Sequence, residues 1–250
     1  MSSLSVLVVV HNEEKQLKDC LRTISFADEI VVILDKCNDK SKEIASKFTK
    51  NIYSGKWDIE GERRNFGLKK CSKEWIFEID ADERVPILLR KEIIKTIKIN
   101  KKDWFHIKLN NFVGKKIVSH GWGAYIGKSA YAGLFRNGKK EWGSQRVHPK
   151  IILKGEKGIA LKNHLDHYYC QNIEDLFFKL NTYSSLRALD LKDNNVNETL
   201  PKNISRLFSR FWKSYFLRKG YKEKNYGVII AVIAALYPLV SYLKFKNYKA

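Results

Sequence analysis

Two aspartates, Asp80 and Asp82, follow directly on an apolar segment and are separated by a single alanine. Alternate residues of an extended chain project to the same side, so the two carboxylates can be presented together where a strand ends. Hard divalent cations are held by one or two carboxylates together with phosphate oxygens of a substrate. The pair therefore predicts a cation site for a phosphorylated substrate, although the same pattern also occurs in solvated turns and helix caps.

The segments that must position these aspartates alternate between strand and helix patterns. Parallel neighbours in a sheet need crossover connections, so the alternation predicts an α/β fold with a mostly parallel sheet flanked by helices. Asn12 is expected to cap the first helix, with Glu13 and Glu14 in its first turn. The predicted strands are Leu4 to Val10, Glu29 to Asp35, Ile52 to Tyr53 and Trp75 to Ile79, and later helices are Ser41 to Phe48 and Gly61 to Lys70.

Polar clusters follow three of the predicted strands, at His11 to Glu14, Asp35 to Asp39 and Asp80 to Glu83. In open α/β sheets, ligands bind beyond the carboxyl ends of the strands. Three such clusters at one expected edge predict a nucleotide site there.

The pattern changes after residue 100. Short alternating segments between residues 104 and 161, punctuated by glycines, predict hairpins and a mixed or antiparallel second half of the sheet. We therefore expect one domain over residues 1–170, whose first half (1–100) carries the predicted nucleotide site and whose second half is residues 101–170. Residues 171–250 are expected to form a basic, apolar, helical extension.

The formal net charge of +20 and the pI of about 9.7 indicate an anionic partner, which could be nucleic acid, a membrane surface or a phosphorylated substrate. Residues 201–250 hold eleven Lys or Arg and one Glu, and these flank an uncharged run over residues 226–243. That run is a buried helix, an interfacial helix or, as the minor alternative, a span. The concentration of charge beside it favours an anionic membrane surface over nucleic acid.

The 44% apolar content excludes a disordered chain. The four cysteines show no C-x-x-C spacing, which predicts reduced thiols in a cytosolic protein rather than a zinc site or a disulfide framework. The apolar N-terminal stretch has no basic leader and is interpreted as a buried strand rather than a signal peptide.

Several motifs together resemble the inverting family 2 glycosyltransferases, which have a GT-A fold, and in particular the bacterial lipopolysaccharide core β-1,4-glucosyltransferase type. The likeness covers nearly the whole chain. It is carried by VVVHNEE at the first strand end, ADEIVVILD with Asp39 a short loop later, and ERRNFGL followed by EWIFEIDADERV. It continues with HGW at His120 to Trp122, LFR at Leu134 to Arg136, VH at Val147 and His148, HYY at His167 to Tyr169, and LRKGY at Leu217 to Tyr221.

The resemblance implies roles on the donor side. His11, Asn12 and Glu13 would hold the uridine, and Asp35 would accept a hydrogen bond from the uracil imide. Arg64 would approach the nucleotide, and Asp80 and Asp82 would hold Mg²⁺ or Mn²⁺ against the diphosphate, whose developing charge must be neutralised as it leaves.

The resemblance makes residues 1–170 a catalytic domain with an acceptor half over residues 101–170, and in that half the match departs from the family. The look-alikes usually read V-H-E, whereas Pro149 follows His148 here, so an expected carboxylate is absent. Inversion needs a general base, for which Asp166 or His148 is favoured and Glu141 is a further candidate. His120, Trp122 and Arg136 are expected near the sugar or acceptor, although Trp122 could equally be a core residue beside a turn glycine.

The resemblance implies transfer of a hexose from a nucleotide sugar, with UDP as the expected nucleotide, to a lipopolysaccharide core or other lipid-linked saccharide. The enzyme would be cytoplasmic and peripheral on the inner face of the cytoplasmic membrane. A polyprenyl phosphate acceptor is the alternative within the class. A non-catalytic nucleic-acid-binding module is the alternative from another class, without a recognisable motif to support it, and a catalytically inactive scaffold is a third.

Overall fold

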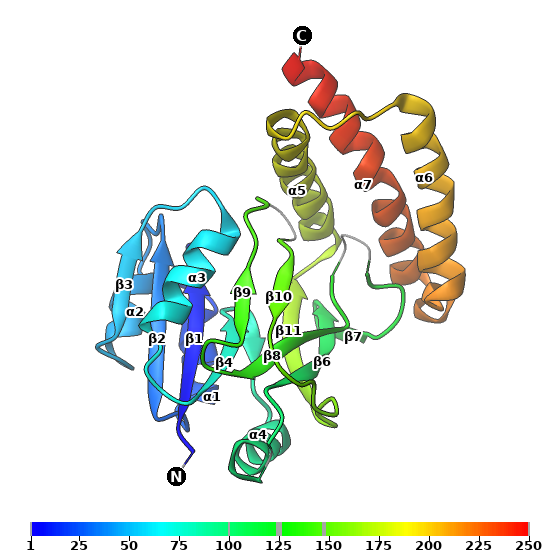
Figure 1. Cartoon of the computed structure of the whole chain (residues 1–250). Helices are drawn as coiled ribbons and strands as arrows, with labels where there is room; N and C mark the ends of the chain where they lie inside the picture. The colour runs from blue at the N-terminus through cyan, green and yellow to red at the C-terminus, as the bar shows by residue number, and fades with distance from the viewer. Residues whose placement is uncertain (1, 100, 124–126, 147–148, 250) are drawn as a thin grey trace. The chain divides into compact units, whose positions relative to one another are not determined.

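The structure is a computed structural model of the chain, and it describes all residues except 1, 100, 124–126, 147–148 and 250 (Figure 1). Contacts divide the chain into two compact units. Unit 1 comprises residues 1–109, 130–145 and 149–167, and unit 2 comprises residues 110–129, 146–148 and 168–250. The predicted domain boundary at residue 170 remains a prediction. By contacts, residues 110–129 and 146–148, which precede residue 170, belong to unit 2.

Unit 1 begins with the predicted parallel sheet. Its strands are β1 (Leu4–Val10), β2 (Glu29–Asp35), β3 (Ile52–Gly55) and β4 (Trp75–Asp80), in the order β3-β2-β1-β4. All three pairings are parallel. The connections contain α1 (Leu17–Thr23), α2 (Ser41–Ser46) and α3 (Glu60–Lys70), so the α/β prediction is confirmed.

The predicted N-terminal cap of the first helix is wrong. Helix α1 begins at Leu17, and Gln16 rather than Asn12 precedes it. Asn12 has a left-handed backbone (φ 56°), a conformation that asparagine tolerates better than most residues. Its side-chain oxygen accepts a hydrogen bond from Asn38 N–H (2.9 Å) instead of capping a helix.

The sheet continues with antiparallel strands, as predicted. The order runs β4-β8-β6-β11-β5, and β7 pairs with β6. Strands β6 and β11 continue from unit 1 into unit 2, and β9 and β10 form a separate hairpin. The bounds are β5 (Glu83–Arg84), α4 (Ile87–Ile99), β6 (Trp104–Val113), β7 (Lys116–Val118), β8 (Ala130–Arg136), β9 (Lys140–Trp142), β10 (Ile151–Leu153) and β11 (His164–Cys170).

The continuous apolar runs of β1 and β2 are explained by burial on both faces of the sheet. Val6, Val8 and Val10 pack in one core cluster with residues of α1, α2 and α4. Leu7 and Val9 pack in a second cluster with Leu68 and Cys71, at the end of α3. Helix α3 therefore covers the opposite face, which is the side from which it delivers its arginines to the carboxyl edge.

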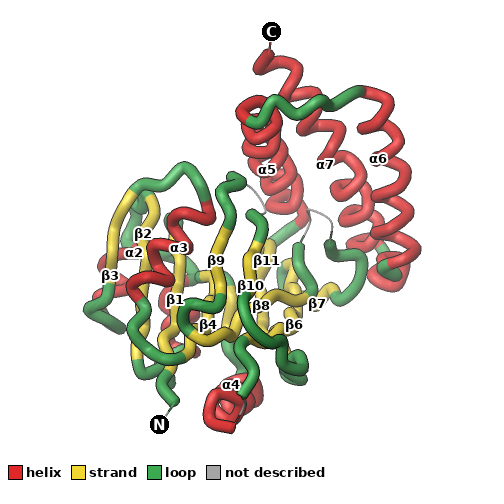
Figure 2. The backbone as a smooth tube through the Cα atoms, viewed as in Figure 1, coloured by secondary structure: helices red, strands yellow, loops and turns green. Residues whose placement is uncertain are grey.

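Unit 2 is mostly helical, and its helices are drawn in red in Figure 2. They are α5 (Ile173–Asp193), α6 (Leu200–Trp212), a π-helical turn (Lys213–Leu217), a 3-10 turn (Gly220–Glu223) and α7 (Asn225–Lys249). Helix α7 packs against both α5 and α6. Its residues Ile230, Ile233 and Tyr237 lie in the core cluster of this unit.

By length and composition, α7 is the one helix in the described part of the chain that could cross a membrane, over Asn225–Tyr248. Just over half of its most apolar window (56%) is buried within the protein. Such burial is typical of a core helix, which favours the buried alternative for the uncharged run.

Candidate functional site

The carboxyl ends of the parallel strands bring the three predicted polar clusters to one edge of unit 1. Val9 pairs with Asp80, and Val10 pairs with Leu34, so His11 and Asp35 follow side by side. The Nδ1 atom of His11 lies 2.7 Å from the carbonyl oxygen of Asp35. The register that the buried strands impose thus collects the polar ends at the place where open α/β sheets bind ligands.

The turn after β1 is locked to the loop after β2. Glu13 N–H donates to Ser41 Oγ (3.1 Å), and Glu14 N–H donates to Asp39 Oδ2 (2.9 Å). In return, the side chain of Glu14 accepts from Lys40 N–H (3.0 Å). His11 and Asn12 stay exposed at this edge, where they are available to a ligand.

Asp35 is the most buried of the predicted nucleotide residues, with 3% of its surface exposed. Its Oδ1 accepts from Trp57 N–H (3.0 Å), and its Oδ2 accepts from Arg63 Nη1 (2.8 Å). A carboxylate has further lone pairs, so these bonds leave acceptor capacity. Recognition of a base by Asp35 remains a prediction, and the structure adds Arg63 as the residue that holds its carboxylate.

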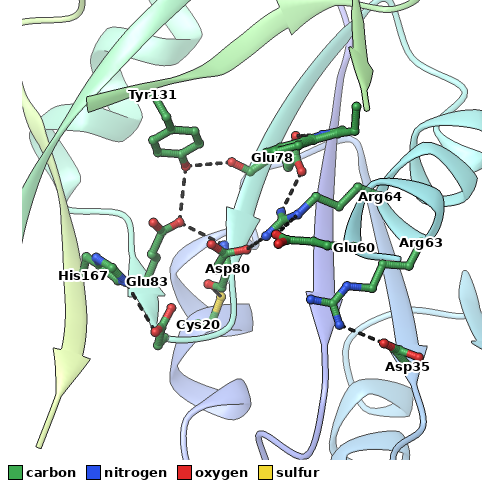
Figure 3. A network of polar contacts seen from close by, with 12 residues as sticks. Cys20, Asp35, Glu60, Arg63, Arg64, Glu78, Asp80, Glu83, Tyr131 and His167 are labelled. Carbon is green, nitrogen blue, oxygen red and sulfur yellow. Dashed lines mark hydrogen bonds and ion pairs between the residues drawn. The ribbon is translucent and has the colours of Figure 1, made fainter. Parts of the chain in front are cut away.

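Arg64 reaches three carboxylates from α3 (Figure 3). Its Nε, Nη1 and Nη2 donate to Glu60 (2.9 Å), Glu78 (2.8 Å) and Asp80 (3.0 Å) respectively. Burial opposes the charge of Arg64, but Asp80, Glu60 and Glu78 outweigh it and raise the pKa of the guanidinium. The structure therefore makes Arg64 a buried group that orients Asp80, and any direct approach to a nucleotide remains a prediction.

Helix α3 is fixed in place by the β9–β10 hairpin. Asn65 Nδ2 donates to the carbonyl of Trp142 (2.8 Å), and Trp142 N–H donates back to Asn65 Oδ1 (2.9 Å). A Cβ added at Gly61 would meet the carbonyl oxygen of Gly143 at 1.8 Å, so only glycine permits this approach. The hairpin thereby fixes the helix that carries Arg64.

Glu78 is a residue of this site that the sequence analysis missed. It is buried within β4, two residues before Asp80 and on the same face of the strand. Its Oε1 accepts from Arg64, and its Oε2 accepts from Lys140 Nζ (2.7 Å) and Trp142 Nε1 (3.2 Å). The sequence did contain an indication of this role, because a glutamate inside the apolar strand WIFEID needs a cationic partner when it is buried.

The turn after β4 holds the second aspartate. The Oδ2 atom of Asp82 lies 3.4 Å from Nε2 of His167, which is almost fully buried on β11. Glu83 is buried, accepts from Asp80 N–H (2.9 Å), and pairs with His167 in the antiparallel β5–β11 ladder. His167 belongs to the HYY motif but was not predicted to contact the aspartates, because strand pairing at such sequence distance is set by the fold.

The candidate base Asp166 is the neighbour of His167 on β11 and pairs with Arg84. Successive residues of a strand point to opposite faces, so Asp166 and His167 face opposite ways. The role of Asp166 remains a prediction. The other candidate, His148, lies outside the described residues.

Two predicted acceptor residues belong to unit 2. His120 Nδ1 lies 2.7 Å from Oε1 of Glu223, which also accepts from the backbone N–H groups of Ser119 and His120. Trp122 is 4% exposed, and its ring packs edge-on against Tyr169 in the core cluster of that unit. The structure thus favours the core alternative for Trp122 over a sugar platform.

Arg136 does not lie beside the aspartates, and its expected acceptor role stays a prediction. It pairs with Trp75, the first residue of β4, whereas Asp80 is the last. At about 3.3 Å per residue, the two positions lie roughly 17 Å apart along the strand. The guanidinium instead stacks over the Trp75 ring (4.5 Å) and pairs with Glu74.

The residues present fit a divalent cation that binds together with a phosphate. The side chains of Asp80 and Asp82 are 26% and 20% exposed, so both carboxylates are accessible at the edge. Within residues 2–99, 101–123, 127–146 and 149–249, no group of three or more His, Cys, Asp or Glu forms a ready-made metal cage. Mg²⁺ is commonly bound by one or two carboxylates together with substrate phosphates and water, and this pair could supply the carboxylates of such a site.

Comparisons with known proteins agree with this geometry. The family model described as "Glycosyl transferase family 2" matches residues 5–121. The lipopolysaccharide core biosynthesis glycosyltransferase LpsC of Rhizobium meliloti (strain 1021) is 24% identical over 96% of this chain and 91% of its own length. An uncharacterized glycosyltransferase of Rickettsia bellii (strain RML369-C) is 22% identical over 93% of this chain and 82% of its own length.

A similar fold is found in the crystal structure of S. aureus TarS 1-349 in complex with UDP. The TM-score is 0.50 at 16% sequence identity, with 99% of this chain and 89% of that chain covered. The fold is of the GT-A type, as the sequence predicted.

Proposed function

Because residues 5–121 match the model of glycosyl transferase family 2, we propose that the chain is a member of this family and transfers a sugar from a nucleoside diphosphate sugar to a saccharide acceptor. The observation that carries this proposal is the pair Asp80 and Asp82 at the end of β4, held by Arg64 and His167 beside the turn after β1. This arrangement suits a diphosphate leaving group that is neutralised by a metal ion.

The proposed donor is a UDP-linked hexose. His11, Asn12 and Glu13 would contact the uridine from the turn after β1, with Asp35 on the base. The structure of TarS in complex with UDP supports the choice of nucleotide through likeness of fold. Asp35 already accepts from Trp57 and Arg63, and its remaining lone pairs would receive the N–H of the base.

In the proposed complex, Asp80 and Asp82 would hold Mg²⁺ or Mn²⁺. When bound, the ion neutralises the charge that develops on the departing diphosphate. Arg64 holds Asp80 through Oδ1, and Glu83 accepts from the Asp80 N–H, so the chain itself fixes the first carboxylate before the donor arrives. The second carboxylate, Asp82, is contacted by the chain as well, since its Oδ2 lies 3.4 Å from His167 Nε2.

The proposed acceptor is a lipopolysaccharide core or another lipid-linked saccharide, supported by the name of the relative LpsC. Transfer would proceed with inversion, with Asp166 or His148 removing the proton from the acceptor hydroxyl. The Asp166→Asn and His148→Ala variants are expected to differ. The variant that lacks the base should lose sugar transfer by about 10²-fold or more while still binding donor. Full transfer by both variants would remove both candidates.

The direct test of the donor is thermal stabilisation in the presence of Mn²⁺ and a panel of nucleotide sugars. A ligand that binds only the native state raises the melting temperature, by an amount that corresponds to about 2.7 kcal/mol at 100 times its dissociation constant. UDP and one UDP-hexose should stabilise the protein only when Mn²⁺ or Mg²⁺ is present. Stabilisation by generic DNA in low salt, with no response to UDP, would instead support the nucleic-acid alternative.

The contact between His167 and Asp82 gives a separate prediction. Residues that orient a metal-binding side chain typically contribute 10- to 100-fold to metal affinity or activity. His167→Asn should therefore raise the Mn²⁺ concentration needed for half-maximal activity by about tenfold or more, as measured by metal titration of the transfer rate. The matched control is His164→Asn on the same strand, and an equal response of both variants would contradict a specific role for His167.

A further inference from the structure

Helix α6 of unit 2 presents its apolar side to the exterior. Ile204, Phe208 and Trp212, spaced four residues apart, are 44%, 69% and 56% exposed. A helix on the surface of a globular domain normally turns such a stripe toward the core. The outward stripe is therefore a feature that packing within this chain does not explain.

The polar side of the same helix faces the protein. Asn203 is 1% exposed, and its Nδ2 donates to Glu198 (3.1 Å) and to the Thr199 carbonyl (2.9 Å). Arg206 Nη1 donates to both carboxylate oxygens of Glu198 (2.9 and 2.8 Å). These bonds tie the polar side of α6 to the segment that precedes it, so that side is occupied by internal contacts while the apolar stripe stays exposed.

The apolar stripe continues past the end of α6. In the π-helical turn, Phe216 and Leu217 are 43% and 65% exposed. The ring of Phe216 lies 4.3 Å from that of Trp212, and the ring of Tyr215 lies 5.1 Å from that of Phe216. We call the stripe with this extension the α6 face, made of Ile204, Phe208, Trp212, Phe216 and Leu217.

Positive charge surrounds the α6 face. Residues 200–224 contain eight Lys or Arg and one acidic residue, Glu223. Glu223 is buried and is hydrogen-bonded to His120. The exposed charges of this segment are therefore positive, and they include Lys202, Lys213 and Lys219.

We propose that the α6 face is a docking surface for an anionic lipid bilayer, in which the aromatic and aliphatic side chains enter the headgroup boundary and the lysines contact lipid phosphates. Exposed apolar aromatics bordered by lysines are the pattern of helices that lie in a membrane interface. A second copy of this chain is a poorer occupant, because it would bring two positively charged surfaces together. The core helix α7 supports this surface from behind and need not leave the protein.

This inference goes beyond the proposed function and can be tested without it, since lipid binding requires neither donor nor acceptor. The full-length protein would be sedimented with sucrose-loaded vesicles of phosphatidylcholine alone, or with about one third phosphatidylglycerol. It should bind the anionic vesicles, and binding should fall at about 0.5 M salt as the lysines are screened. Failure of the wild type to bind anionic vesicles at low salt would overturn the proposal.

The decisive variant is Phe208→Glu with Trp212→Glu. It should weaken vesicle binding by about thirtyfold or more, because two apolar side chains no longer enter the lipid and two negative charges oppose it. The matched control is Ile159→Glu, which places one glutamate at a 90% exposed apolar position of unit 1 and should leave binding unchanged. Both proteins should melt like the wild type, since the replaced side chains are exposed.

Two results would assign the α6 face to another occupant. Wild-type binding by the double variant would show that the aromatic residues do not contact lipid. Conversion of a wild-type dimer to a monomer by the double variant, measured by sedimentation without vesicles, would assign the face to a second copy. If UDP still stabilises the protein while vesicle binding fails, the proposed function stands and this inference alone falls.

Discussion

Replacement of Asp80 and Asp82 by Asn together is expected to lower kcat/KM for sugar transfer by about 10³-fold or more, since charge stabilisation of a leaving group is the largest contribution available to such a site. Asparagine keeps the shape of each side chain but removes its charge, so the variant tests the metal rather than packing. The measurement is transfer of labelled sugar as a function of Mn²⁺ concentration, alongside calorimetric binding of UDP with and without the metal.

The two aspartates are expected to differ when changed singly. Asp80→Asn also removes the charge that Arg64 Nη2 contacts, so it should lower stability as well as activity. Asp82→Asn weakens a partly exposed contact with His167, so its largest effect should be on the binding of metal and donor. Asp19→Asn on α1, an exposed carboxylate paired with Arg22, is the control and should keep full activity. Full metal-dependent activity in the double variant would exclude the proposed cation site.

The second large effect is expected from the buried ion network behind Asp80. Lys140 has 0% and Glu78 has 2% of its side chain exposed, and their charged atoms lie 2.7 Å apart. Removal of one partner of a buried pair leaves an uncompensated charge and typically costs about 3–5 kcal/mol. Lys140→Met should therefore lower the free energy of unfolding by about this amount, measured from the urea midpoint at constant slope.

A double-mutant cycle separates the interaction energy between Glu78 and Lys140 from the destabilisation that each substitution causes by itself. Glu78→Gln with Lys140→Met removes both charges, so it should be less destabilising than the sum of the single changes by about 0.5–3 kcal/mol. The control is Lys154→Met, whose exposed ammonium lies 3.9 Å from Glu141 and should contribute no more than about 1 kcal/mol. Strict additivity of the two buried changes would contradict the coupling.

The network also predicts a pH dependence of stability. Burial alone would raise the pKa of Glu78, but the charges of Lys140 and Arg64 outweigh it, and the pKa lies below its ordinary value of 4.5. The contribution of Glu78 to stability is thus fully present above about pH 4.5 and is lost as the pH falls through its native-state pKa. Acid unfolding of Glu78→Gln should show a shallower loss of stability below that pH than the wild type.

The parallel sheet and its functional edge could be predicted from local pattern. The β-branched run from Leu4 to Val10 is buried on both faces, and such runs carry the same signal in any context. Because parallel strands end at one edge, the positions of His11, Asp35 and Asp80 followed from strand order alone. The antiparallel character of the second half of the sheet was also predicted. Which strands pair with one another was not, because pairing between strands that are distant in sequence has no local signature.

The partners of the site residues were not predictable in the same way. The contact of Arg64 with Glu60 is local to α3, but its contacts with Glu78 and Asp80 depend on how the helix packs over β4. His167 and Asp166 are adjacent in sequence, and only the pairing of β11 with β5 decides which of them faces Asp82. Arg136 was assigned to the acceptor by its motif, but antiparallel pairing places it at the start of β4.

The sequence by itself determined the type of fold and the two carboxylates at a strand end, because residue periodicity and spacing along one strand are local properties. Only the tertiary structure decided that Glu78, Lys140 and Arg64 form the buried support of Asp80. It also decided that the apolar side of α6 faces outward while residues of α7 enter the core of unit 2. The physical reason is that helix orientation and ion pairing depend on which surfaces meet, and those contacts join residues far apart in the chain.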